Sequence, residues 1–255
     1  MANWARNLLF VTAALCFAEP QPKAGEWQSL FDGKSLRGWR ETPFSGHGKV
    51  RIEDESIVLE AGAPMTGITR TDAFPGSNYE VRFQAAKIQG GDFFASLTFP
   101  VHDSFCTWVT GGWGGDIVGL SSIDGWDASD NETRAYFNFE TGRWYAFRLQ
   151  VSDDRIMAWI DDRSIVNVEI RGRTIGLRRG EIKLSAPFGF ASYNTTGRLR
   201  RIEYRVLQAP LLPLPLLDAG GELFLPGQLK RALNGARCCA LACTRPGCAG
   251  SGSTL

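Results

Sequence analysis

The sequence predicts an all-β fold, a sandwich or jelly roll built from two antiparallel sheets. Between Trp27 and Leu207, short runs that alternate apolar and polar residues follow one another, separated by turn-forming residues. This alternation is typical of strands with one face in a core and the other toward water. No stretch in this range keeps the i, i+3, i+4 apolar spacing of an amphipathic helix for three turns. About a dozen or more short strands with almost no helix favour a two-sheet sandwich.

The clearest strands are NYEVRFQAAKI (78–88) and RWYAFRLQVS (143–152), in which every second residue is apolar. The residues predicted to face the core are Tyr79, Val81, Phe83, Ala85, Tyr145, Phe147, Leu149 and Val151. The runs RIMAWID, SIVNVEI, GFASYN and RLRRIEYRVL continue the pattern. SDDR (152–155) and IDDRSI (160–165) are expected to be hairpin turns, because Asp side chains bond the local backbone.

The two ends of the chain differ from this body. Residues 1–18 combine a short positive segment, an apolar run of eleven residues and a small residue before Glu19, which is typical of a secretory signal peptide. We therefore expect export to the periplasm or the cell exterior, with residues 19–25 as a linker. The alternation ends at Leu207, and residues 208–255 contain one aromatic residue and a Gly/Ser-rich end. They are expected to be a disordered or aberrantly translated tail.

Composition argues against several classes of partner. The net charge is +1 and no block of like charge occurs, so a nucleic-acid surface is not expected. The apolar run near the N-terminus is too short to cross a membrane, and none of the later apolar runs in the sequence is longer. Four of the six cysteines lie in the last eighteen residues without the paired CxxC spacing or a nearby histidine. This arrangement does not predict a zinc site.

Two parts of the chain resemble the 3-keto-disaccharide hydrolase domain family. EWQSLFDGKSLRGWR (26–40) is similar to the family's W-x-x-L-F-D-G-x-x-L-x-G-W opening, and the strands over 143–170 and 180–207 are similar to its closing half. GGDFFASLTFPVHDS (90–104) lacks the Gly-Ile pair and the Arg that are frequent in the family, so the chain looks like a divergent branch. The resemblance covers 26–207 and implies a concanavalin A-like jelly-roll sandwich in exported bacterial proteins that handle carbohydrate.

The segment GGWGGDIVGLSSIDGWD (111–127) lacks clear helix or strand periodicity. We expect it to be a loop, extended to Glu132, at the rim of the concave sheet. Trp113 and Trp126 can stack on a pyranose ring, and carboxylates such as Asp124 accept hydrogen bonds from sugar hydroxyls. With Asp92 these three residues form the predicted substrate-binding set. The alternative is that the tryptophans plug the edge of the core.

The catalytic candidates are His102, Asp116 and Asp127. Two carboxylates about 5–9 Å apart can serve glycoside hydrolysis as acid and base or nucleophile, although the E-x-D-x-x-E strand of related β-glucanases is absent. A histidine can transfer a proton near neutral pH. Closely spaced oxygens in DGWDASDNE (124–132) make Ca²⁺ a possible cofactor, although the EF-hand order is missing. No metal ligand is assigned.

The resemblance implies a carbohydrate-active protein that hydrolyses or eliminates the glycosidic bond of 3-keto-glycosides or disaccharides. A ketone at C3 acidifies the neighbouring C–H, so a base removes that proton and the glycosidic oxygen departs from the β-position. This reaction needs one base and an electrophile at the ketone rather than a carboxylate pair. The first alternative is a non-catalytic carbohydrate-binding module, and the second is a structural cell-surface sandwich. The sequence leaves open whether the protein is an enzyme.

Overall fold

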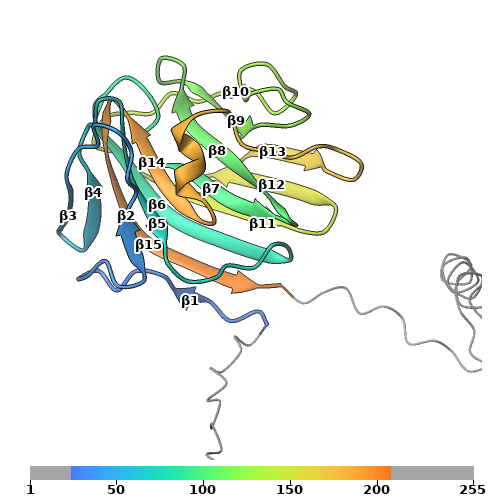
Figure 1. Cartoon of the computed structure of the whole chain (residues 1–255), viewed down its shortest axis with the longest axis horizontal. Helices are drawn as coiled ribbons and strands as arrows, with labels where there is room; N and C mark the ends of the chain where they lie inside the picture. Colours follow the sequence, from blue (N-terminus) through green and yellow to red (C-terminus); the bar gives the residue numbers. More distant parts are fainter. Residues whose placement is uncertain (1–23, 208–255) are drawn as a thin grey trace, which may run out of the picture. The chain divides into compact units, whose positions relative to one another are not determined.

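The computed structural model describes residues 24–207. These residues form fifteen β-strands and one short 3-10 helix, arranged as two antiparallel sheets (Figure 1). The predicted all-β jelly-roll sandwich is therefore confirmed. Within residues 24–207, no helix is long and apolar enough to cross a membrane. The interpretations of residues 1–18, of most of the linker 19–25 and of residues 208–255 lie outside the described residues.

Sheet A has eight strands, in the order β13-β12-β11-β6-β15-β4-β3, with β1 added along β15. Its strands are β1 (Gln28–Ser29), β3 (Val50–Glu53), β4 (Ser56–Leu59), β6 (Tyr79–Gly90), β11 (Trp144–Val151), β12 (Arg155–Ile160), β13 (Arg163–Glu169) and β15 (Thr195–Val206). The chain turns between β11 and β12 and again between β12 and β13, which confirms both hairpins predicted from the Asp-rich sequences.

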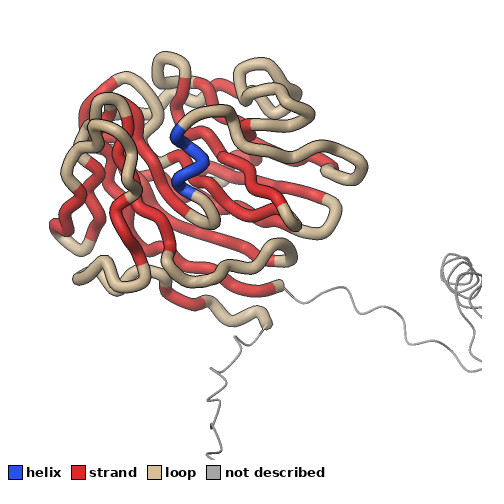
Figure 2. Tube along the Cα trace, in the orientation of Figure 1, coloured by secondary structure: helices blue, strands red, loops and turns tan. Residues whose placement is uncertain are grey.

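Sheet B has seven strands, in the order β10-β9-β8-β7-β14-β5-β2. Its strands are β2 (Trp39–Glu41), β5 (Met65–Arg70), β7 (Ser96–Val101), β8 (Ser104–Gly112), β9 (Ile117–Ser121), β10 (Ala135–Tyr136) and β14 (Gly189–Tyr193). The 3-10 helix η1 (Glu181–Ser185) lies across β14 and β5 on the face of sheet B that points away from sheet A (Figure 2).

The core lies between the two sheets and is rich in aromatic rings. The eight residues predicted to face inward from β6 and β11 are all at most 2% exposed. Phe83 and Phe147 stack with ring centroids 4.9 Å apart, and Trp108 meets both rings edge-on. Trp39 of the opening motif is also buried, and its indole Nε1 donates to the carbonyl of Leu30 at 2.7 Å. The alternation of apolar and polar residues in the sequence thus identifies the face of β6 and of β11 that packs in the core.

The expectation that residues 111–127 form one loop is wrong, because residues 117–121 form strand β9 between β8 and β10. Both faces of β9 are covered. A Cβ on Gly119 would meet Ala128 at 3.2 Å, and the amide of Ala128 donates to the Ser121 hydroxyl at 2.9 Å. A strand buried on both faces has no need of polar and apolar alternation, so the period-two criterion missed it.

Candidate functional site

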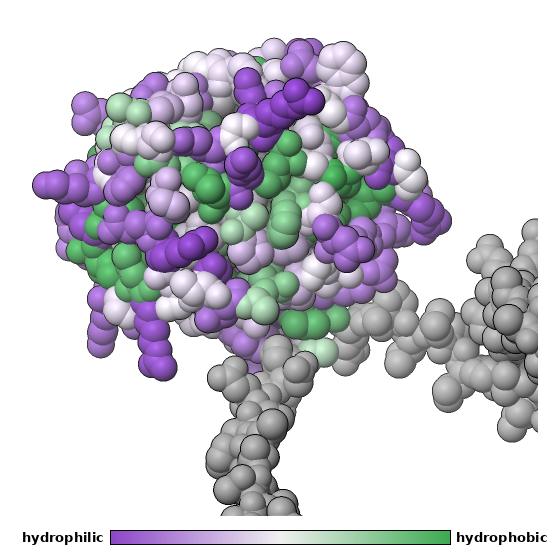
Figure 3. All heavy atoms as spheres, viewed as in Figure 1, coloured by the Kyte–Doolittle hydropathy of each residue, from purple (hydrophilic) through white to green (hydrophobic). Residues whose placement is uncertain are grey.

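A cleft of about 390 Å³ lies on the outer face of sheet B. Its floor is made by side chains of five strands that point away from the core, namely Met65, Ser96, Thr107, Val109, Ser121 and Tyr193. Its walls come from residues 92–93, residues 112–113 and residues 178–182, which lead into η1. In the space-filling view of this face, apolar side chains gather in the middle and polar side chains border them (Figure 3).

The hydroxyl groups of the floor are mostly used by the protein itself. Thr107 is hydrogen-bonded to Thr98 at 3.0 Å, Ser96 accepts the amide of Thr110 at 3.2 Å, and Ser121 accepts the amide of Ala128 at 2.9 Å. Ser96 and Ser121 act as acceptors in these bonds, so their hydroxyl hydrogens are the polar groups that the floor keeps for a ligand. The charged and aromatic side chains of the walls therefore provide most of the recognition.

Asp92 is the carboxylate at the junction of two walls. Its Oδ1 accepts the amide of Phe93 at 2.8 Å, and the amide of Gly114 lies 3.4 Å from its Oδ2. The backbone of Asp92 is fixed as well, because its amide donates to the Thr195 hydroxyl at 3.0 Å. Each carboxylate oxygen thus keeps accepting capacity beyond the one backbone amide near it.

Trp113 and Arg178 form the wall beside β8 and β9. Trp113 is 38% exposed and lines the cleft. The guanidinium of Arg178 lies 5.5 Å from the centroid of the Trp113 ring, and its Nε lies 3.3 Å from the carboxylate of Asp127. Asp127 does not line the cleft, but it pairs with Arg178, which does.

Asp124 holds two segments together rather than facing the cleft. It accepts the amide of Thr174 at 2.7 Å and the guanidinium of Arg173 at 2.5 Å. The amide hydrogen bond, followed by the arginine, lowers the pKa of the Asp124 carboxyl. Arg173 also pairs with Glu132 at 2.7 Å, and the amide of Ser122 donates to Gly176 at 2.7 Å. The 122–134 loop is thereby tied to the segment that carries Arg178.

Trp126 stands on the outside of this loop. Its side chain is 63% exposed, and its backbone is paired with Ile123 in both directions, at 2.9 and 3.0 Å. The alternative that Trp126 plugs the core is therefore wrong. Trp126 is not among the residues that line the cleft. Asp116 is exposed at the rim and likewise does not line it.

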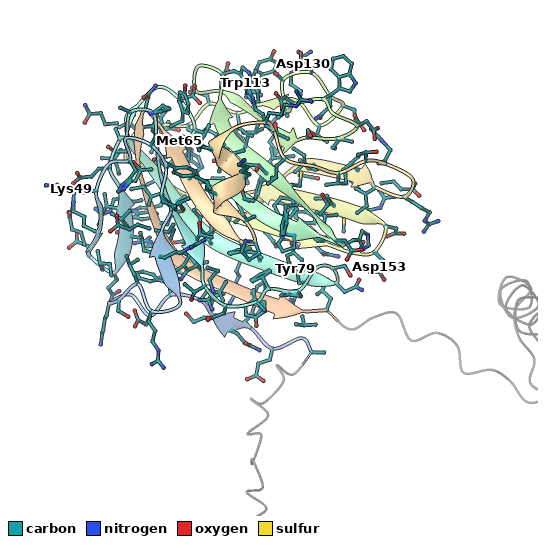
Figure 4. The ribbon with its side chains drawn as sticks, viewed as in Figure 1. Lys49, Met65, Tyr79, Trp113, Asp130 and Asp153 are labelled. Atoms are coloured by element: carbon teal, nitrogen blue, oxygen red, sulfur yellow. The ribbon has the colours of Figure 1, made fainter. Side chains whose placement is uncertain are left out.

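His102 lies far from the cleft, which corrects the expectation that it joins the other candidates. It occupies the turn between β7 and β8, where its Nε2 lies 3.0 Å from the carbonyl of Asp153. The nine residues of β8, at about 3.3 Å each, separate this turn from Trp113 by roughly 25–30 Å. Figure 4 shows Trp113 and Asp153 at opposite edges of the molecule.

Several residues of the cleft were not predicted from the sequence. They are Met65, Phe93, Arg178, Arg179, Glu181, Ile182 and Tyr193. Glu181 accepts the hydroxyl of Ser45 at 2.6 Å and its amide at 2.9 Å, and these hydrogen bonds lower the pKa of the Glu181 carboxyl. The sequence feature that could have indicated this wall of the cleft is the pair of arginines in LRRGEI (177–182), a stretch without the apolar and polar alternation of a strand.

The Ca²⁺ alternative for 124–132 gains no support from this arrangement. Asp124 and Glu132 both bind Arg173. Within residues 24–207, no group of three or more His, Cys, Asp or Glu side chains is placed to hold a metal ion.

Similar solved structures include a carbohydrate-binding module from Bacillus subtilis, at 13% identity and a TM-score of 0.46 over 66% of this chain and 95% of that one. Domain 4 of the extracellular arabinanase AbnA from Geobacillus stearothermophilus, solved with arabinotriose, is similar at 16% identity and a TM-score of 0.48, over 73% of this chain and 94% of that one. No curated protein matches the chain in sequence.

The family comparison covers most of the chain. The model of the 3-keto-alpha-glucoside-1,2-lyase-like domain matches residues 26–205, which spans the sandwich from the opening motif into β15 and includes every wall of the cleft. The chain therefore belongs to the family of 3-keto-alpha-glucoside-1,2-lyase-like domains, a carbohydrate-related β-sandwich family.

Proposed function

We propose that the chain cleaves the glycosidic bond of 3-keto-glycosides by elimination, in the cleft on the outer face of sheet B. One observation carries the proposal. A carboxylate, two guanidinium groups and an exposed indole, from three separate segments, line the same cleft: Asp92, Arg178, Arg179 and Trp113. The family match supports the reaction class.

The reaction requires a base and a group that stabilises negative charge. The base removes the proton on C2, and the ketone at C3 takes up the charge as an enolate. The electron pair then forms a C1=C2 double bond while the C1–O bond breaks, and its electrons leave on the aglycone oxygen, which takes up a proton. The products are an unsaturated keto-sugar and a free alcohol. Addition of water to C1 of the unsaturated sugar gives net hydrolysis.

Asp92 is the carboxylate best placed to act as the base. The nearby amides of Phe93 and Gly114 orient it at the junction of two walls. The other carboxylate in the cleft, that of Glu181, is held by two hydrogen bonds from Ser45. These bonds, at 2.6 and 2.9 Å, stabilise the carboxylate form of Glu181 and lower its pKa, which makes it the weaker base.

The arginines and the tryptophan complete the site. Arg178 and Arg179 place positive charge where an enolate oxygen develops, which is the kind of electrostatic stabilisation that lowers such barriers most. Arg179 also lines the cleft, and among residues 24–207 it forms no ion pair such as the one between Arg178 and Asp127. Trp113 offers a ring on which a pyranose can stack. Asp127 positions Arg178, and His102 and Asp116 have no part in this site.

The test is turnover of a 3-keto-α-glucoside by the full chain, followed by the near-ultraviolet absorbance of the conjugated enone. Asp92→Asn keeps an oxygen for the Phe93 amide but removes the base, and we expect kcat to fall by about 100-fold or more. Asp116→Asn is the matched control at the exposed rim, and its rate should stay within about twofold of wild type.

Two results would count against the proposal. A wild-type rate for Asp92→Asn would remove Asp92 as the base. Binding of 3-keto-glucosides and plain glucosides without turnover would favour the alternative of a carbohydrate-binding module, which the Trp113 surface also suits.

A further inference from the structure

The two ends of the cleft differ in chemistry, and the strand order of sheet B shows how. The floor runs across β9-β8-β7-β14-β5. Trp113 follows β8, and Arg178 comes two residues after Gly176, whose carbonyl is bonded to Ser122 just beyond β9. Tyr193 and Met65, at the other end, are directly paired residues of β14 and β5. The end of the cleft beside β8 and β9 therefore carries the positive charge of Arg178. The end over β14 and β5 is lined by Met65 and Tyr193.

The second end is an apolar chamber, made by Met65, Phe93, Ile182 and Tyr193. These side chains belong to a hydrophobic cluster around Phe44, separate from the core between the sheets. The rings of Phe93 and Tyr193 lie 5.5 Å apart, and the amide of Tyr193 donates to the carbonyl of Phe93 at 2.9 Å. Figure 4 places Met65 and Trp113 in the same half of the molecule, apart from each other.

Polar groups in the apolar chamber are few. The carboxylate of Glu181, next to Ile182 in the chain, also lines the cleft, and each of its oxygens already accepts one hydrogen bond from Ser45. The phenol of Tyr193 is the remaining side-chain donor among the chamber residues. A pyranose placed here would lose water from several hydroxyl groups and recover few hydrogen bonds, which is costly.

We propose that the apolar chamber binds the aglycone, and that the preferred substrates are 3-keto-glycosides of an apolar alcohol or phenol rather than 3-keto-disaccharides. This inference rests on the proposed function. Asp92 stands between the two ends, because it precedes Phe93 in the chain and its carboxylate faces the amide of Gly114, next to Trp113. Elimination at Asp92 places the keto-sugar against Trp113 and the arginines and the departing alcohol in the chamber.

The experiment compares kcat/KM of the full chain on two substrates, cyclohexyl 3-keto-α-glucoside and a 3-keto-disaccharide of two glucose units. An aliphatic alcohol is a poorer leaving group than a sugar hydroxyl, so intrinsic reactivity favours the disaccharide. We expect the enzyme to reverse this order and to prefer the cyclohexyl glycoside by at least about tenfold, the size of effect that an apolar pocket gives.

A variant pair locates the preference in the chamber. Ile182→Asn makes the wall polar and should lower the ratio of kcat/KM for the cyclohexyl glycoside to kcat/KM for the disaccharide by about fivefold or more. Lys183→Gln is the control, since Lys183 is exposed on the same 3-10 helix and does not line the cleft. Its preference should equal that of wild type. Met65→Gln gives a second reading if Ile182→Asn does not fold.

The outcomes separate the two proposals. Equal or better turnover of the disaccharide by wild type overturns the aglycone inference and leaves the elimination reaction standing. A cyclohexyl preference that survives both Ile182→Asn and Met65→Gln also overturns it. Turnover of neither substrate refutes the proposed function itself.

Discussion

Trp113 and Trp126 make a paired test of where sugar binds, because one lines the cleft and the other stands outside it. Replacing Trp113 with Ala removes a stacking surface worth about 1 kcal/mol. That free energy corresponds to a rise of about fivefold in KM for a 3-keto-glucoside. The same change at Trp126 should leave kcat/KM within about twofold of wild type, because the side chain does not reach the cleft.

The structure also sets the expected stability of Trp126→Ala, for which a change at a core tryptophan is the comparison. A tryptophan buries at most roughly 250 Å², so Trp126, which is 63% exposed, removes roughly 90 Å² from water. At about 25 cal/mol per Å² this is at most about 2 kcal/mol, or a fall in melting temperature of less than about 8 °C. Changing the fully buried Trp108 to Ala should lower the free energy of unfolding by about 3–5 kcal/mol.

The assay is steady-state kinetics well below the melting temperature of each variant, with melting followed by calorimetry. A tenfold or greater loss of kcat/KM in Trp126→Ala, with a nearly unchanged melting temperature, would refute the reasoning. It would place the sugar on the 122–134 loop instead of in the cleft. An unchanged KM in Trp113→Ala would refute the stacking role of that residue.

Three further predictions follow from single contacts. Asp127→Asn removes the carboxylate that faces Arg178 at 3.3 Å, so kcat should fall severalfold while far-ultraviolet circular dichroism is unchanged; an unaltered kcat contradicts the positioning role. The lowered pKa of Glu181 means that its hydrogen bonds stabilise the fold above its unfolded-state pKa and cease to do so as pH falls through the folded value. Denaturant melts should therefore show Ser45→Ala as less stable than wild type at pH 7, with the difference shrinking below about pH 4; a gap that persists at pH 2–3 contradicts this. Burial raises the pKa of the Cys106 thiol to about 12, so peptide mapping should find it unalkylated by iodoacetamide at pH 8 until denaturant is added.

The fold could be predicted where strands are half exposed. In β6 and β11 one face meets the core and the other meets water, so the alternation in the sequence identified all eight inward residues. Strand β9 could not be found this way, because residues 122–134 cover its outer face. Burial on both sides removes the polar half of the pattern on which the prediction depends.

The candidate site could be predicted only in part, because its walls meet through long-range contacts. Asp92 and Trp113 line the cleft as the sequence suggested. Glu181 and Ser45 are 136 residues apart in the chain, and no local sequence pattern predicts their contact. His102 is near Trp113 in sequence but at the far end of a hairpin in space, since the extended strand between them carries the chain away from the cleft.

Sheet B divides the molecule into two parts that can change independently during evolution. Its inner side carries the aromatic core, while the small cluster around Phe44, Met65 and Ala191 lies on its outer side. Substitutions at Phe93, Ile182 or Tyr193 reshape a surface that the main core does not contain. A lineage of these proteins can therefore acquire new ligands for the cleft one wall residue at a time, without first acquiring compensating changes in the packing between the sheets.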